Sequence, residues 1–335
     1  MLHLVALAAC AVAVYLACEW FVNAVEWLGP RLRLGPLAVG TVLAAFGTAL
    51  PESAVTFVAA VLGGSPAQKD IGVGAAMGGP LALATVAYAV TGWMLFTKPR
   101  NASQVDAGHI DTVKLARDQT WFLVIFVVKV VLGLVTFAFK PWLGIAMFAA
   151  YAVYFISEIR SSRDDKSVVQ EDPSPLLLQR RRARPATWAI LVQAIGTLVI
   201  ILVASQFFVR QLESAATLLG LPAAVTALLL SPVATELPEI MNAIIWVRAG
   251  KSQLALANIS GAMMIQATVP SGIGLLFTPW RLDAPLLVSG LMTMAAIGYL
   301  LVVLRRGRLS PATLSVAGVF YLAFAALLIP ALAAS

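Results

Sequence analysis

The chain has 335 residues, of which 60% are hydrophobic and only 12% are charged, and its net charge is +7. Its mean hydropathy is +0.90. Soluble domains contain about one-quarter charged residues, so this composition argues against a soluble domain. Apolar segments of about 18 residues or more recur along the whole chain, which predicts an all-α polytopic membrane protein. Two cysteines within one apolar segment do not indicate a disulfide framework.

The apolar segments predict ten transmembrane helices. In chain order they cover residues 2–28, 35–62, 71–96, 120–139, 141–157, 187–210, 221–248, 252–278, 284–304 and 310–332. A polar segment at 158–186 separates a first five-helix unit, residues 1–157, from a second, residues 187–335. Its charges of both signs, together with Ser and Pro, are typical of a flexible, solvated linker.

Lys and Arg are unevenly distributed between the two sides of the predicted membrane. Eighteen of the 23 fall on one side, including "RRRAR" at 180–184, and four fall on the other. The positive-inside rule makes the rich side cytoplasmic, so we expect a protein of the cell (inner) membrane with both termini outside the cytoplasm. The basic run is then an orientation signal, and no nucleic-acid partner is expected.

One basic residue, Lys129, falls inside the predicted helix 120–139. It could be an internal counter-ion. We favour the alternative, in which its long side chain reaches the membrane surface from a peripheral helix.

Two short sequences place Thr, Pro and Glu inside apolar helices: "TALPE" at 48–52 and "TELPE" at 235–239. Residues 18–52 align with residues 205–239 without a gap, and the identities cluster at polar and Pro positions. This pattern indicates a duplication. Because each unit has an odd number of helices, the second copy would be inverted in the membrane. Inverted repeats are common in secondary transporters, whose binding sites lie near the bilayer midplane.

The two prolines predict breaks in these helices. Pro51 and Pro238 lack the N–H that would bind a backbone carbonyl one turn earlier. Within a membrane such a break is tolerated where it lines a cavity or meets another partner. Free carbonyls and carboxylates are the oxygen ligands of a hard cation, and Ca²⁺ is the best fit among the common ones.

Five side chains around the breaks are candidate cation ligands. Thr48 lies one helical turn before Glu52, and Thr235 lies one turn before Glu239, so that each hydroxyl and carboxylate can face one ion. Glu236 could add a third carboxylate. A charge at the bilayer centre costs about 2.5–3.5 kcal/mol, so we expect cations or protons to neutralise these groups. Protonated Glu side chains that hydrogen-bond between helices are the alternative, and it is most open for Glu236.

The segment "LACEWFVNAVEWLGPRLRLGPLAVGTVLAAFGTALPE" resembles the first signature repeat of the cation/calcium exchanger superfamily. "SPVATELPE" resembles its second repeat, in a form like those of bacterial members. The resemblance covers both halves of the chain. It implies that Glu52 and Glu239 are the central calcium ligands, assisted by oxygens of Thr48 and Thr235. It also implies that helices 1 and 6 slide across the bundle to expose the site alternately to each side.

The first half departs from the family pattern where sodium ligands are expected. The family usually has Ser after the Thr, whereas this chain has Ala49. In the third helix, Gly79 and Leu83 stand at the positions of the Ser and Asn ligands. The first half has therefore lost oxygen ligands.

The second half departs differently. Glu236 stands where the family usually has Ser, and the eighth helix, "ANISGAMMIQA", keeps Asn258 and places Gln266 at the last ligand position. These departures weaken the expectation of sodium coupling more than that of calcium binding. Proton coupling and Mn²⁺ as the divalent ion stay open.

Together these features predict an antiporter that exchanges a divalent cation, above all Ca²⁺, for Na⁺ or H⁺ by alternating access. We expect no enzyme activity and no cofactor, and the expected partners are inorganic cations and the lipid bilayer. A cation channel or a non-transporting sensor with the same acidic site is the alternative. Of the other acidic residues, Glu26 and Glu213 lie close to helix ends and are expected to be solvated, while Glu19 could line the ion pathway. The sequence does not predict an oligomeric state.

Overall fold

The structure, a computed structural model, is helical almost throughout and contains no β-strand among the residues it describes. The described residues are 2–32, 34–35, 38–62, 66–97, 110–164, 173–182, 184–220 and 226–333. Within them, seven helices are long and apolar enough to cross a membrane, or up to eight if one bent pair counts as a single span. The all-α, multi-pass architecture predicted from the sequence is therefore present, whereas the count of ten spans stays a prediction.

The first half of the chain is dominated by long helices, several of which continue through short π-helical turns. Its elements are α1 (Leu2–Arg31), η1 (Val39–Ala44), α3 (Ala45–Phe57), η2 (Val58–Leu62), α4 (Pro66–Ala82), η3 (Leu83–Ala87), α5 (Tyr88–Phe96), α7 (Thr112–Leu134), η4 (Lys140–Trp142) and α8 (Leu143–Asp164).

The second half has a similar run of helices and one interruption. Its elements are η5 (Leu177–Gln179), α9 (Thr187–Leu218), η6 (Thr226–Leu230), α11 (Ser231–Thr235), α12 (Leu237–Arg248), α13 (Ser252–Phe277), α14 (Ala284–Arg305) and α15 (Pro311–Ala333).

Helix α7 differs most from its predicted range of 120–139. It begins at Thr112 because the Asp111 side chain accepts a hydrogen bond from Lys114 N (2.9 Å) and so caps the helix. It ends at Leu134, because Val135 is extended. The prediction followed the apolar residues alone and missed the polar first two turns.

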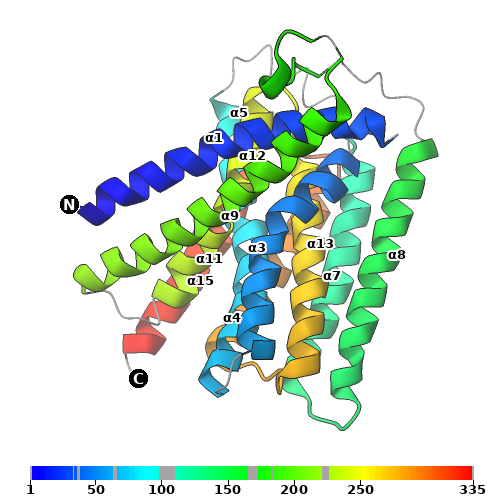
Figure 1. Ribbon diagram of the computed structural model, residues 1–335. Coiled ribbons are helices and arrows are strands. Elements are labelled where there is room, and N and C mark those ends of the chain that lie inside the picture. The colour runs from blue at the N-terminus through cyan, green and yellow to red at the C-terminus, as the bar shows by residue number, and fades with distance from the viewer. Residues whose placement is uncertain are drawn as a thin grey trace.

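Helix α13 lies at the centre of the protein. It contacts α3, α4, α7, α8 and α12, and most of its side chains are buried. Close approach to η1 depends on glycines, because a Cβ on Gly261 would lie 2.2 Å from Thr41 O and one on Gly40 would lie 2.8 Å from Ala257 Cβ. Figure 1 shows α13 upright among α3, α7 and α8. It is the element against which the candidate ligands are arranged.

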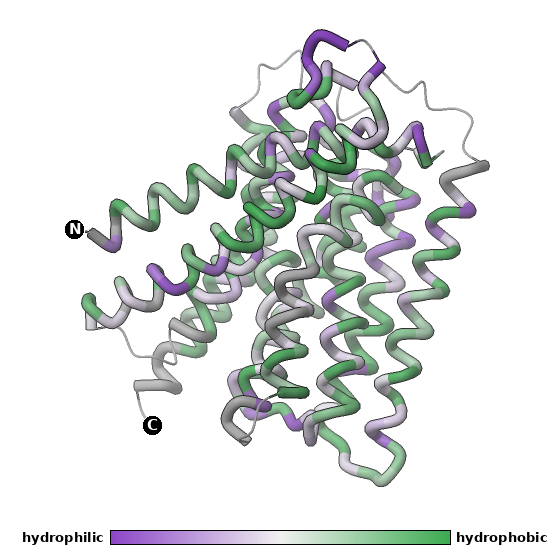
Figure 2. The backbone as a smooth tube through the Cα atoms, in the orientation of Figure 1, coloured by the Kyte–Doolittle hydropathy of each residue, from purple (hydrophilic) through white to green (hydrophobic). Residues whose placement is uncertain are grey.

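Helices α1 and α9 pack side by side and run obliquely to the upright helices (Figure 1). They are antiparallel, since His3 near the start of α1 is 2.8 Å from Gln211 near the end of α9, and Gln193 near the start of α9 donates to Trp20 O (2.8 Å). Apolar side chains on both helices are exposed, as expected for contact with lipid. Figure 2 shows apolar residues along most of α1 and much of α9, with a more hydrophilic stretch toward the end of α9.

Part of the linker between the two halves is packed rather than solvated, which differs from the expectation of a flexible loop. Leu176 is fully buried in a cluster with Ala24 and Ile190. Asn23 of α1 donates to Ser174 O (3.2 Å), and its side-chain oxygen accepts from Leu177 N (3.0 Å). The described part of the linker is therefore fixed to α1 and α9.

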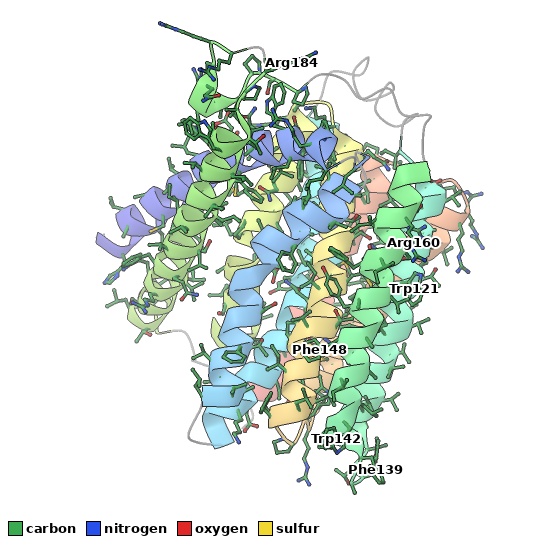
Figure 3. All side chains as sticks on the ribbon, turned by 45° about the vertical axis from the view of Figure 1, so that its right-hand side comes forward. Trp121, Phe139, Trp142, Phe148, Arg160 and Arg184 are labelled. Atoms are coloured by element: carbon green, nitrogen blue, oxygen red, sulfur yellow. The ribbon has the colours of Figure 1, made fainter. Side chains whose placement is uncertain are left out.

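Several exposed aromatic and basic side chains can be placed along the long axis of the protein (Figure 3). Phe139 and Trp142 are exposed at the lower end of the view, whereas Arg160 lies toward the upper end and Arg184 at the top. Aromatic side chains favour membrane interfaces, and Arg favours the cytoplasmic side. The membrane orientation itself stays a prediction.

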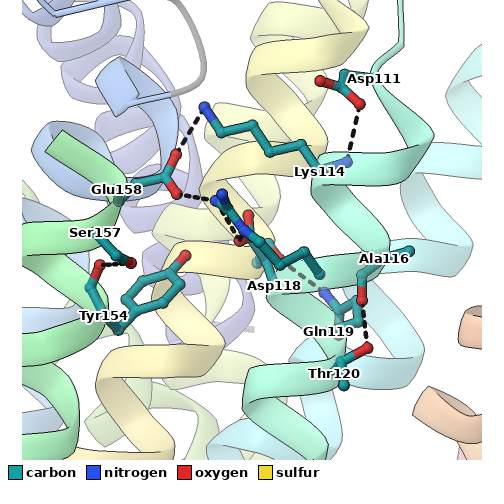
Figure 4. Close-up of polar contacts among 11 residues, drawn as sticks. Asp111, Lys114, Ala116, Asp118, Gln119, Thr120, Tyr154, Ser157 and Glu158 are labelled. Atoms are coloured by element: carbon teal, nitrogen blue, oxygen red, sulfur yellow. Dashed lines mark hydrogen bonds and ion pairs between the residues drawn. The ribbon is translucent and has the colours of Figure 1, made fainter. Parts of the chain in front are cut away.

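A buried ion-pair network joins α7 to α8 (Figure 4). Lys114 Nζ lies 3.1 Å from Glu158 Oε1, and the Arg117 guanidinium lies 2.5 Å from Glu158 Oε2 and 3.1 Å from Asp118 Oδ1. Both carboxylates are fully buried. Two acidic and two basic side chains neutralise one another here, so that this network can hold α7 against α8 without a bound ion.

The expectation that Lys129 reaches the membrane surface is wrong. Its side chain is fully buried, and Nζ donates a hydrogen bond to Ala76 O on α4 (2.8 Å). The physical reason is packing, because α7 is covered on this face by α13 and α14 and is not peripheral there.

Candidate cation-binding site

Glu236 lies at the interruption between α11 and α12, where the helix axis bends by 52°. Pro238 follows in the first turn of α12, a position at which the missing N–H costs nothing. The break predicted from the proline is thus present in the second half. Glu236 is therefore the residue immediately before α12.

The Glu236 carboxylate meets Gln266 of α13 inside the protein. Gln266 Nε2 donates to Glu236 Oε1 at 2.7 Å, and both side chains are almost completely buried. Gln266 Oε1 has no hydrogen-bond partner among the described residues. Because an amide oxygen accepts but cannot donate, this atom is available to a cation. The structure therefore brings together two residues that the sequence placed in one site.

Gly79 of α4 makes room for this pair. A Cβ at Gly79 would lie 2.7 Å from Glu236 Oε1 and 2.7 Å from Gln266 Oε1, closer than real Cβ contacts. The glycine that replaces a ligand in the first half and the Glu that replaces Ser in the second half are thus spatial neighbours. Glu236 thus places a carboxylate oxygen beside α4 at Gly79.

Glu239 lies in the first turn of α12 and is buried. The partial positive charge of a helix N-terminus favours a carboxylate at this position. Cys18 of α1 contacts the preceding residue, with Sγ 3.7 Å from Pro238 O. Glu239 therefore lies close to the interface between α12 and α1, one of the two tilted helices.

The side chain of Glu52 lies outside the part of the chain that the structure describes, as do those of Leu50 and Pro51. Its backbone belongs to α3, which contacts both α12 and α13. The predicted pairing of Glu52 with Glu239 stays a prediction.

The two threonines direct their hydroxyl protons toward their own helices. Thr48 Oγ1 donates to Ala44 O (3.1 Å), and Thr235 Oγ1 donates to Pro232 O (3.0 Å). A hydroxyl that has given its proton to a carbonyl still has lone pairs to offer a cation. Both threonines therefore remain suitable ligands, although no described contact joins Thr48 to Thr235.

Asn258 of α13 is fully buried, and neither Oδ1 nor Nδ2 has a hydrogen-bond partner among the described residues. The same is true of Asn242 on α12, which sequence reasoning missed. Buried amides without partners are costly unless a ligand or water satisfies them. Asn242 could have been found from its spacing, because it lies three residues after Glu239 and thus on the same helix face.

Asn242 and Asn258 lie at similar depth. The two helices that carry them are joined by a short turn at Ala249–Lys251, and the residues are equally far before and after Gly250. Together with Glu239 they place a carboxylate and two amides on the inner faces of α12 and α13. This set of oxygen ligands suits a hard cation such as Ca²⁺.

Two further expectations about acidic residues can be compared with the structure. Glu26 is not solvated, because its carboxylate accepts from Trp246 Nε1 (2.9 Å) and pairs with Lys251 Nζ (2.5 Å). Its position near a helix end had suggested exposure, but α12 and the turn after it cover that end. Glu19 is exposed on α1, and the side chain of Glu213 lies outside the described residues.

Comparison with known proteins places this geometry in context. The family model described as sodium/calcium exchanger protein matches residues 2–159 and 189–329. A protein of Alkalimonas amylolytica named "Putative antiporter CaxA" is 25% identical over 305 residues, which cover 88% of this chain and 87% of that protein.

The fold resembles that of two structures of the sodium-calcium exchanger NCX_Mj, one soaked with 2.5 mM Na⁺ and 0.1 mM Ca²⁺ and one with 10 mM Na⁺ and no Ca²⁺. Each has a TM-score of 0.75 and 18% sequence identity, and the match covers 98% of this chain and 99% of the other. The shared fold thus extends over almost the whole chain.

Proposed function

Because the chain belongs to the sodium/calcium exchanger protein family, we propose that it is a secondary antiporter that exchanges Ca²⁺ for Na⁺ or H⁺ by alternating access. The observation that carries this proposal is the buried oxygen cluster around α12 and α13. Glu236 and Gln266 meet in it, and the amide of Asn258 has no hydrogen-bond partner among the described residues. Such a cluster inside a multi-pass membrane protein is suited to a positively charged occupant.

Ten helices in two inverted five-helix repeats, residues 1–157 and 187–335, would bring Glu52 into the same site. Contact of α3 with both α12 and α13 supports this arrangement. In it, Glu52 and Glu239 hold the ion as the central ligands, and Thr48 and Thr235 add neutral oxygens. The basic side of the protein, including the linker, faces the cytoplasm, and both termini face outward.

Exchange follows from the cost of leaving the carboxylates uncompensated. A site that has lost Ca²⁺ carries buried negative charge, which resists movement through the membrane interior. Monovalent cations or protons must therefore bind before the site can turn to the other side. Since Ca²⁺ and the driving ions neutralise the same carboxylates, they exclude one another.

The tilted helices are the elements suited to move. Helices α1 and α9 pack mainly against each other and expose apolar side chains, and α1 contacts α12 beside Glu239. A sliding movement of this pair past α12 would open the site to one side and close it to the other. The α13-centred bundle would remain in place.

Calcium uptake into sealed vesicles tests the proposal. The protein is reconstituted into liposomes, and an outward gradient of Na⁺ or of H⁺ is imposed separately. We expect uptake against a calcium gradient with at least one of the two driving ions. Uptake only down the calcium gradient would indicate a channel, and calcium binding without flux would indicate a sensor.

Substitution of Glu239 by Gln should abolish this uptake, because it removes a carboxylate from the site while preserving its shape. Asp70→Asn is the matched control, since Asp70 is exposed on α4. The control should transport normally. Uptake by Glu239→Gln at the wild-type rate would contradict the assignment.

A further inference from the structure

Lys129 is a buried basic side chain in the last third of α7. Its side chain is fully buried, and its Nζ lies 2.8 Å from Ala76 O and 4.6 Å from the centre of the Phe126 ring. No carboxylate of the described residues lies within ion-pair distance of it. A lysine in such surroundings is costly unless nearby negative charge compensates it.

The contact with Ala76 has a clear origin in the sequence of α4. Pro80 lies four residues after Ala76 and has no N–H, so the Ala76 carbonyl loses its helical hydrogen bond. Lys129 supplies the missing donor. A neutral amide or hydroxyl could donate equally well, so the hydrogen bond alone does not explain why the residue is charged.

The Glu236 carboxylate lies across the same turn of α4. A Cβ on Gly79 would be 2.7 Å from Glu236 Oε1. Ala76 O and Gly79 belong to one helical turn, so helix geometry places Lys129 Nζ within about 10 Å of the Glu236 carboxylate. At that separation in a protein interior, one charge still changes the binding of another substantially.

We propose that Lys129 is a resident cation of the exchange site, whose fixed charge takes the place of one transported monovalent ion. This inference rests on the proposed function. The site then contains three carboxylates, Glu52, Glu236 and Glu239, and one ammonium group, and its net charge is two negative. One Ca²⁺ or two monovalent cations neutralise that charge.

The proposal explains two departures of this chain together. Glu236 adds a carboxylate at a Ser position, and Lys129 adds the cation that balances it. The positions that lost oxygen ligands in the first half, Ala49, Gly79 and Leu83, then have no third monovalent ion to hold. Exchange is electroneutral, with two monovalent cations for each Ca²⁺.

The stoichiometry of the reconstituted protein tests this directly. The calcium gradient at which net flux stops is measured against known gradients of the driving ion and of voltage. Wild-type protein should exchange two monovalent ions per Ca²⁺, and flux should not respond to the membrane potential. Voltage-dependent exchange by the wild-type protein would overturn the inference, although gradient-driven uptake would still support the proposed function.

Three variants sharpen the test. Lys129→Met should require three monovalent ions per Ca²⁺, become voltage-dependent and bind Ca²⁺ about tenfold more tightly without the driving ion, because a repulsive charge is lost. Lys129→Arg should behave like wild type. The double variant Lys129→Met with Glu236→Gln restores the net charge and should return to voltage-independent exchange.

An unchanged stoichiometry in Lys129→Met would contradict the proposal. If Lys129→Met does not fold, the double variant and the voltage measurement on wild-type protein still test the proposal. Complete absence of gradient-driven uptake by wild-type protein would instead contradict the proposed function itself.

Discussion

Buried charge is treated differently in two regions of this protein. At the ends of α7 and α8, Glu158 and Asp118 each lie next to the Arg117 guanidinium, and Lys114 completes a neutral network. Around α12 and α13, Glu236 instead accepts a hydrogen bond from the neutral amide of Gln266. The first region contains its own counter-ions, whereas we propose that the second binds the transported cations.

Under this proposal, the polar groups of the first region hold the scaffold, and those of the second region bind the transported ion. Removing a partner from a neutral network should weaken folding, because the opposite charge is left buried. Removing an oxygen from the site should weaken ion binding and leave folding intact. Stability and calcium affinity, measured on the same variants, therefore distinguish the two regions.

The largest effect on stability is expected for Glu158→Gln. It leaves Lys114 and Arg117 without their shared carboxylate, and Arg117 is 38% exposed, so solvent screens part of the loss. We expect about 2 kcal/mol of lost stability, seen as a lower melting temperature in detergent by tryptophan fluorescence. Calcium uptake per folded molecule should be unchanged.

The matched control for this variant is Glu19→Gln, because Glu19 is exposed on α1 and belongs to no ion pair among the described residues. Its melting temperature should equal that of the wild type. If Glu158→Gln unfolded at the wild-type temperature but lost uptake, the network would belong to the transport machinery rather than to the scaffold.

The sequence predicted the features that depend on local chemistry. Apolar segments gave the helices, and Pro238 predicted the interruption at which Glu236 lies. Glu236 and Gln266 were both assigned to the site, and the structure joins them by a hydrogen bond. These predictions succeeded because a proline or a carboxylate in a membrane helix has few physical explanations.

Features that depend on tertiary contact were missed. The apolar sequence around Lys129 is the same whether the side chain faces lipid or the α4 carbonyl, so its direction could not be inferred. The fit between Gly79 and Glu236 joins residues from different halves of the chain, and no local pattern reports it. Glu26 was expected to be solvated because it lies near a helix end. Its partner, Lys251, belongs to the other half of the chain, so the local sequence contained no sign of the ion pair.

A smaller effect is expected for Gly79→Ala, whose methyl group would lie only 2.7 Å from Glu236 Oε1 and from Gln266 Oε1. Overpacking of this kind costs about 1–3 kcal/mol, and here it must displace two of the proposed ligands. We expect calcium binding to weaken about tenfold, measured with radioactive calcium on purified protein.

Gly298→Ala in α14 is the matched control for Gly79→Ala, because a Cβ at Gly298 meets open space. It should bind calcium normally and lose no stability. Equal calcium affinities for the two variants would show that Glu236 and Gln266 can move apart without loss, and therefore that their present positions do not define the site.

The smallest effect, and the most specific in sign, is expected for Asn242→Leu. Both amide atoms of Asn242 are buried without hydrogen-bond partners among the described residues, so an apolar side chain of similar size should raise stability slightly. If Asn242 Oδ1 is a cation ligand, calcium affinity should fall severalfold in the same variant. Asn242→Asp, which keeps an oxygen at this place, should retain binding. Unchanged calcium affinity in Asn242→Leu would show that Asn242 has only a structural role. A rise in stability together with a fall in calcium affinity would instead show that Asn242 serves ion binding rather than folding.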